Sequence, residues 1–119
     1  MRVTCGVDTE LDRTLLAEPA GRMDAHGATI VHDSIADRLS DKTPFLLLDM
    51  SQVEYLSSAG ISTLIRLLTR SREVGGTISV FNCRPVVRQV IKVVAIEPVV
   101  NVRGTVEEAR ERLRELGAA

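Results

Sequence analysis

The sequence has no tryptophan, and aromatic residues make up only 3% of it. Its hydrophobic core must therefore be built mainly from aliphatic side chains. The scarcity of aromatic rings also argues against a protein that stacks the bases of single-stranded nucleic acid on its side chains. The formal net charge of −1 at pH 7 gives no electrostatic reason to expect DNA, RNA or an anionic membrane as a partner.

Cysteine is scarce as well, with only Cys5 and Cys83 present. Two cysteines do not make a disulfide framework, and no Cys-x-x-Cys motif or nearby histidine completes a set of metal ligands. Each cysteine falls in a predicted strand, where a small, buried, unreactive residue is the usual role. We therefore expect neither a disulfide nor a metal site.

Long apolar runs are missing from the chain. No stretch approaches the roughly 18 consecutive apolar residues of a transmembrane helix. The first residues, Met1–Cys5, also lack the apolar run of a signal peptide. We expect a soluble, cytoplasmic protein that does not insert into a membrane.

What the chain does contain is typical of one globular domain. Its 119 residues are 45% hydrophobic and 26% charged, which excludes a disordered chain. We expect a single domain over residues 1–119.

Apolar periodicity and turn residues predict alternating strands and helices. Strands are expected over residues 4–7, 13–17, 45–48, 77–81 and 98–102, and Pro19–Gly21 is expected to break the chain. Asp24 is a good N-cap for a helix over residues 25–39, and a second helix is expected over residues 58–74. Pro85 opens a third helix, and the capping box Thr105–Glu108 opens a fourth. The order ββαβαβαβα predicts the α/β class, a small mixed β-sheet with helices packed on it.

The same periodicity predicts which residues are buried. Phe45–Leu48 is a continuous apolar run, which is typical of a central strand covered on both faces. The second helix is expected to bury Ile61, Leu64, Ile65 and Leu68; the third Val86, Val90, Val93 and Val94; and the fourth Val106, Ala109, Leu113 and Leu116.

Four small residues, Ser57-Ser58-Ala59-Gly60, lie where the second helix begins. In this arrangement they follow the carboxyl end of the central strand, along the edge where open α/β sheets present their functional sites. The amino end of a helix also carries free N–H groups and a partial positive charge, which favour an anion.

No catalytic constellation accompanies these residues. A nucleophile elbow requires a glycine two residues before the serine, and a P-loop requires a lysine after its second glycine; both are absent here. His26 and His32 lie on the first helix with no pattern that ties either to a serine. The Gly75-Gly76 pair follows a helix and precedes a strand, which is the wrong order for a phosphate cradle. The sequence indicates a protein that is not an enzyme and uses no cofactor.

Two interpretations of the serines stay open on the residues alone. One serine caps the helix, a contribution of about 1 kcal/mol, while the other fills the turn. Alternatively, one serine also accepts a phosphate, whose roughly two negative charges would alter the binding of a partner. Helical spacing places Ser62, Arg66 and Arg70 away from the apolar stripe, where the arginines either meet acidic groups of a partner or are simply solvated.

The run from Pro44 to Cys83 resembles the centre of a STAS domain, the domain of sulfate transporters and anti-sigma factor antagonists. The resemblance rests on "LLLDMSQV" before the small-residue turn, "GG" before the next strand and "RPVVRQVIKVVAIEPVVNV" beyond it. Upstream, Gly21–Asp24 resembles the Gly-x-Leu-Asp segment of the family. The resemblance extends over roughly residues 3–115, and a lone STAS domain of this length is most similar to the bacterial anti-sigma factor antagonists.

The resemblance implies a function for the turn. Antagonists of this family bind an anti-sigma factor, often an ATP-dependent serine kinase, and so free a sigma factor for transcription. The kinase phosphorylates the antagonist in the loop before the second helix, binding is lost, and a phosphatase reverses the step. The family pattern Asp-Ser-[Ser/Thr/Ala]-Gly places the phosphorylated serine at Ser58.

One departure leaves the switch open, because Ser57 replaces the aspartate of the family pattern. Ser58 is the first candidate for phosphorylation and Ser57 the second, and a third alternative is a site that only binds. A non-phosphorylated STAS module of a transporter or stress-signalling complex is the alternative function. The expected partner-binding residues are Asp24, Ser57, Ser58, Ala59, Gly60, Ser62, Arg66 and Arg70.

Overall fold

The structure is a computed structural model that describes all 119 residues. The strands are β1 (Arg2–Val7), β2 (Thr14–Met23), β3 (Phe45–Asp49), β4 (Gln52–Leu56), β5 (Ile78–Phe81) and β6 (Val102–Arg103). The helices are α1 (Ala25–Ile35), the 3₁₀ turn η1 (Ala36–Arg38), α2 (Ser58–Glu73), α3 (Pro85–Val93) and α4 (Val106–Glu115). None of these helices has the length and apolarity needed to cross a membrane.

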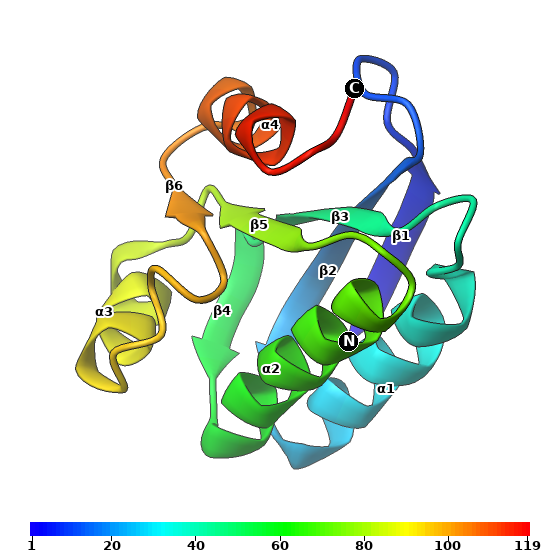
Figure 1. Cartoon of the computed structure of the whole chain (residues 1–119). Coiled ribbons are helices and arrows are strands. Elements are labelled where there is room, and N and C mark those ends of the chain that lie inside the picture. Colours follow the sequence, from blue (N-terminus) through cyan, green and yellow to red (C-terminus); the bar gives the residue numbers. More distant parts are fainter.

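The strands form one mixed sheet in the order β1-β2-β3-β5-β6, and β4 pairs with β2 beyond the end of β3. The β1–β2 pair is antiparallel, and the other pairs are parallel. Helices α1 and α2 lie side by side on one face of the sheet, and α4 covers the other face (Figure 1). The α/β class predicted from the sequence is confirmed.

The apolar run in β3 separates two hydrophobic clusters. Leu46 and Leu48 belong to the larger cluster, which includes buried residues of α1 and α2. Phe45 and Leu47 belong to a smaller cluster that Leu113 of α4 covers from the opposite face. The prediction of a central strand covered on both faces is confirmed, and burial of this aliphatic core is the main source of stability.

The predicted helix starts are also confirmed. The Asp24 carboxylate caps α1, and Pro85 occupies the first turn of α3. Thr105 caps α4, where its Oγ1 accepts a hydrogen bond of 3.2 Å from the Glu108 N–H. The first helix ends earlier than expected, because the chain tightens into the 3₁₀ turn η1 after Ile35.

The predicted break at Pro19–Gly21 was wrong, since β2 continues to Met23. The reason lies in the neighbouring strands. β3 pairs with β2 as far as Ala17, and β4 pairs with it from Ala20 onward. Pro19 lies between these two stretches, where its missing N–H disturbs neither parallel pairing. Gly21 then adopts a φ of +121° beside an irregularity in the β2–β4 pairing.

Strand β4 was not predicted from the sequence. The serine turn (Ser57–Gly60) was expected directly after the central strand, but it follows β4, which pairs with β2. Only Met50 and Ser51 separate β3 from β4. The serine turn therefore lies beside the end of β2, next to the start of α1.

The predicted face of α3 was only partly right, because Val90 is half-buried against the larger cluster but the other three predicted valines are exposed. Val87 and Ile91 are its buried residues, whereas Val86 and Val93 are 57% and 72% exposed and Val94 is 45% exposed. All these valines lie on one broad apolar arc of the helix, and the sheet covers only its edge. Periodicity found the arc but could not show which part of it would meet the sheet.

Other details differ from the sequence prediction. In α2, the small residues Thr63 and Ser71 are buried, while Ile61 and Ile65 are only half-buried. Leu116 in the predicted face of the fourth helix lies beyond α4 and is 40% exposed.

The segment 98–102 is mostly turn, and strand pairing begins only at Val102. Cys83 lies after β5 rather than within it, and both cysteines are half-buried. Burial raises the pKa of the Cys83 thiol to about 11, which keeps the thiol protonated at neutral pH.

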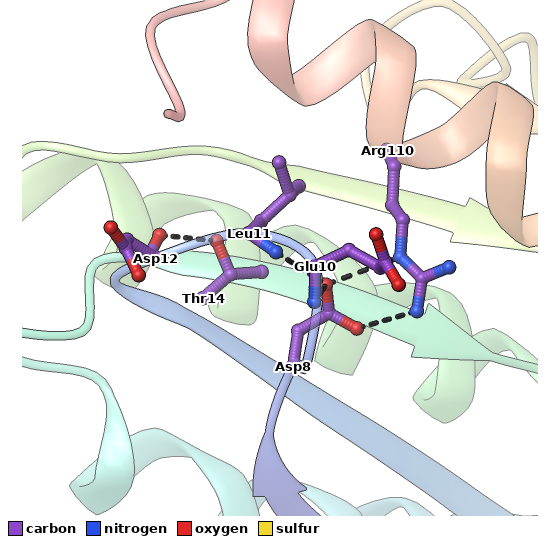
Figure 2. Close-up of polar contacts among 6 residues, drawn as sticks. All are labelled: Asp8, Glu10, Leu11, Asp12, Thr14 and Arg110. Carbon is purple, nitrogen blue, oxygen red and sulfur yellow. Dashed lines mark hydrogen bonds and ion pairs between the residues drawn. The ribbon is translucent and has the colours of Figure 1, made fainter.

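A buried ion pair fastens α4 to the β1–β2 turn (Figure 2). The Asp8 carboxylate is fully buried and accepts hydrogen bonds of 2.8 and 3.1 Å from the Arg110 guanidinium. It also accepts from the backbone N–H groups of Glu10 and Leu11. Burial alone would raise the pKa of Asp8, but Arg110 and these N–H groups lower it below its ordinary value.

Candidate functional site

Ser57 caps α2 and also ties the serine turn to β2. Its Oγ accepts a hydrogen bond of 3.2 Å from the Gly60 N–H, which is the N-cap interaction. The same hydroxyl donates a hydrogen bond of 2.8 Å to the Met23 carbonyl, and the Ser57 N–H donates to that carbonyl at 3.0 Å. The Ser57 side chain is therefore engaged both as donor and as acceptor.

Ser58 is the first residue of α2 and is exposed. Its hydroxyl makes no hydrogen bond within the protein, in contrast to the hydroxyl of Ser57. The first N–H groups of a helix have no intrahelical partners, and the helix dipole gives this end a partial positive charge. Ser58 thus combines a free hydroxyl with a position that favours negative charge.

Close packing rather than backbone conformation favours the glycine of the turn. A Cβ atom on Gly60 would lie 2.5 Å from Leu56 Cδ1 and 3.0 Å from the Met23 carbonyl oxygen. The half-buried Ala59 packs against the large cluster. Small residues here let α2 begin directly against the ends of β2 and β4.

Asp24 occupies the corresponding place in the neighbouring turn. Strands β2 and β4 run parallel with Met23 opposite Leu56, so the caps that follow them, Asp24 and Ser57, lie at equivalent positions. The Asp24 Oδ1 accepts a hydrogen bond of 2.8 Å from the Gly27 N–H. This hydrogen bond lowers the pKa of Asp24 below its ordinary value, so the carboxylate is charged at neutral pH. The structure thus brings Asp24 to the turn that contains Ser57.

The polar residues expected along α2 are only partly available. Ser62 and Arg66 are exposed, and they follow Ser58 at successive intervals of four residues on the same side of the helix. Arg66 donates a hydrogen bond of 3.2 Å to Thr63 Oγ1. Arg70 is half-buried and donates to the Leu39 carbonyl at 3.1 Å, so it braces the end of η1 rather than facing outward with Arg66.

An exposed pair beside the turn, Arg22 and Tyr55, was not predicted from the sequence. The Arg22 guanidinium lies 4.3 Å from the centre of the Tyr55 ring, and the two residues are opposite each other in the β2–β4 pairing. Tyr55 is 39% exposed and lies two residues before Ser57. No local pattern links Arg22 to Tyr55, because only the unpredicted strand β4 brings them together.

The turn itself is not hollowed. Neither of the two clefts on the surface is lined by a residue of 57–60. Both histidines lie on α1 rather than in the turn: His26 is exposed, and the His32 Nδ1 lies 3.5 Å from the Asp33 Oδ1. A flat array of small residues with an exposed hydroxyl suits contact with a macromolecule better than enclosure of a small substrate.

The fold is shared with solved proteins of similar length. SpoIIAA, an anti-sigma factor antagonist and Bacillus cell fate determinant, superposes in its unphosphorylated form with a TM-score of 0.74 and 18% identity, over 94% of this chain and 97% of that one. An anti-sigma factor antagonist from Mycobacterium paratuberculosis gives a TM-score of 0.73 and 23% identity, over 95% of both chains.

The same fold is found within a larger protein. The murine Slc26a9 anion transporter gives a TM-score of 0.69 and 17% identity, over 90% of this chain but only 18% of the transporter. The family model for the STAS domain matches residues 7–109. The match extends over most of the chain, including both strand-to-helix turns and all the strands except most of β1, and the chain therefore belongs to the STAS domain family.

Proposed function

We propose that this chain is an anti-sigma factor antagonist that docks on an anti-sigma factor through the serine turn and is released when Ser58 is phosphorylated. The anti-sigma factor would be the ATP-dependent serine kinase that carries out this phosphorylation. The observation that carries the proposal is the contrast between the two serines. The Ser58 hydroxyl is exposed and free, whereas the Ser57 hydroxyl is held by Met23 and Gly60.

This contrast supports Ser58 over Ser57 as the phosphate acceptor. Phosphorylation of Ser57 would remove the proton that it donates to the Met23 carbonyl and would force four bulky atoms into a close-packed turn. A phosphate on Ser58 would instead extend from the end of α2 into solvent, beside free N–H groups that favour an anion. The missing family aspartate does not remove the cap, since Ser57 supplies it.

The same geometry supports release of the partner. A partner that covers the turn would contact small residues at close range and would exclude water from the Ser58 hydroxyl. A phosphate at that position adds bulk and roughly two negative charges, which docking would have to strip of water. An unpaired charge buried in an interface costs on the order of 3–5 kcal/mol, or more than a hundredfold in affinity.

The first test is an affinity capture from native cell extract, followed by binding with the purified partner. Wild-type protein is expected to retain a kinase-type anti-sigma factor, and Ser58→Asp is expected to lose it. Thr69→Asp is the matched control, because it adds the same charge to an exposed position of α2 farther from the turn. Incubation with the purified kinase and ATP, followed by mass spectrometry, should then place phosphate on Ser58.

The proposal fails if wild type and Ser58→Asp retain the same partner with equal affinity. Phosphate found on Ser57 would transfer the switch to the capping residue. The alternative is a STAS binding module that serves a transporter, and the similarity to part of Slc26a9 supports it. Capture of transporter subunits by both wild type and Ser58→Asp would favour this alternative.

A further inference from the structure

A polar cleft of about 260 Å³ lies at the far end of α2 from the serine turn. Its walls come from the last turn of α2, the residue before β5, the turn before β6 and the last turn of α4. The lining residues are Arg72, Thr77, Pro98, Val99, Asn101, Arg112 and Leu116. Two arginines thus face one cleft that no acidic residue lines.

Arg112 is held in place by a buried amide. Its Nε donates a hydrogen bond of 3.0 Å to Asn101 Oδ1, and the Asn101 side chain is itself fixed by donating to the Ile78 carbonyl at 2.9 Å. Asn101 is only 5% exposed. One edge of the Arg112 guanidinium is therefore oriented by the protein, while Glu115 approaches its Nη1 only to 3.8 Å.

Arg72 and Thr77 have unused donors. Neither the exposed Arg72 guanidinium nor the Thr77 hydroxyl makes a side-chain hydrogen bond, and Arg72 forms no ion pair. Each arginine alone suits the carboxyl end of its helix, where a cation is favoured. That preference does not explain why two helices deliver arginines to a single cleft beside a free hydroxyl.

The other side of the cleft is apolar and accessible. Pro98 is exposed, Val99 is 39% exposed and Leu116 is 40% exposed. Guanidinium groups bind phosphate through paired N–H donors, and the roughly two negative charges of a phosphate monoester match two arginines. We propose that this cleft binds a small organic phosphate, with the phosphate between Arg72 and Arg112 and its apolar part against Pro98, Val99 and Leu116.

The cleft is separate from the serine turn, and its proposed role does not depend on the function proposed for that turn. Fourteen positions of α2 separate Ser58 from Arg72, which is about 21 Å at the rise of an α-helix. A ligand in the cleft and a partner on the turn can therefore be bound at the same time.

The test is a titration of the ¹⁵N-labelled full chain followed by NMR, with phenyl phosphate as the probe. Saturable shifts are expected for the amides of Thr77, Val99, Asn101 and Arg112. Inorganic phosphate should bind more weakly, and benzyl alcohol, which lacks the charge, should produce no saturable shift. Arg72→Gln should weaken phenyl phosphate binding about tenfold or more, since it removes charge-assisted hydrogen bonds without breaking an internal contact.

Two further variants make the outcome decisive. Arg114→Gln is the control for charge, because Arg114 pairs with Glu111 and does not line the cleft, and it should leave the affinity unchanged. Glu115→Gln removes the competitor for Arg112 and should tighten binding about two- to fivefold. The absence of saturable shifts at millimolar probe, or equal affinity of wild type and Arg72→Gln, would overturn the proposal. Equal affinity for inorganic phosphate would overturn the role of the apolar wall.

Discussion

The two strand-to-helix turns after β2 and β4 are built on one plan but differ in their chemistry. In each, a buried strand residue precedes a capping side chain, and a glycine three residues after the cap donates its N–H to it. The Asp24 turn uses a carboxylate, which can only accept hydrogen bonds. The Ser57 turn uses a hydroxyl, which accepts from its own helix and donates to the Met23 carbonyl of the other turn.

This difference shows what serine provides at position 57, where the family pattern has aspartate. An aspartate there could still cap α2, but it has no proton to offer the Met23 carbonyl. Serine satisfies both partners and connects the two turns directly. A serine at position 57 thus keeps the capping role while it removes the charge next to Ser58.

The largest expected change in the free energy of unfolding comes from adding a Cβ atom to the glycine of each turn, Gly27 or Gly60. A Cβ on Gly27 would collide with the Arg22 backbone carbonyl, which cannot move without disturbing β2. A Cβ on Gly60 mainly meets the flexible end of Leu56. Gly27→Ala should therefore lower the free energy of unfolding by about 2–3 kcal/mol, and Gly60→Ala by about 1 kcal/mol or less. Urea unfolding measures both, and a Gly60→Ala variant that is the less stable of the two would contradict the comparison.

A smaller effect is expected from changing the capping hydroxyl. Ser57→Asp keeps an acceptor for the Gly60 N–H but places a carboxylate against the Met23 carbonyl, so it should destabilise the protein by about 1–2 kcal/mol. Ser57→Asn is the matched control, because its amide can both accept and donate, and it should remain close to wild type. If Ser57→Asp equals or exceeds wild type in urea unfolding, the donor role of Ser57 is not significant.

The smallest effect concerns pH. The Gly27 N–H lowers the pKa of Asp24 in the folded state, so the charged cap contributes stability above the unfolded pKa of about 4 and loses it as the pH falls through the lower folded pKa. Ser57 does not titrate in this range. The stability advantage of wild type over Asp24→Ser should therefore shrink from pH 6 to pH 3, and an advantage that stays constant would contradict the charged cap. The Asp8 carboxylate also titrates in acid, but it is common to both proteins and cancels in the difference.

Local chemistry was readable from the sequence, and long-range pairing was not. Asp24, Pro85 and Thr105 were identified as helix starts because caps act within one turn of the chain. The candidate turn at Ser57 and Ser58 was located for the same reason. Strand β4 was missed because only two residues separate it from β3, with no recognisable turn signal between them.

The contacts that distinguish the site depend on that missing strand. The hydrogen bond from Ser57 to Met23 and the stacking of Arg22 on Tyr55 both join β2 to the β4 region of the chain. The exposed valines of α3 were mispredicted for a similar reason. Helical periodicity indicates an apolar arc but not how much of that arc a sheet will cover. Tertiary packing decides both the pairing of β4 with β2 and the burial of α3, and no local sequence pattern encodes that packing.

The ion pair between Asp8 and Arg110 has a consequence for the protein during its synthesis. The two residues are 102 positions apart in the chain. At a translation rate of about 5–20 residues per second, Asp8 is therefore added to the growing chain about 5–20 s before Arg110. Until α4 has been made, nothing covers the face of the sheet that contains Phe45, Leu47 and Phe81. The layer formed by α1 and α2 can assemble before α4 is made, whereas the opposite layer can close only after α4 has been made.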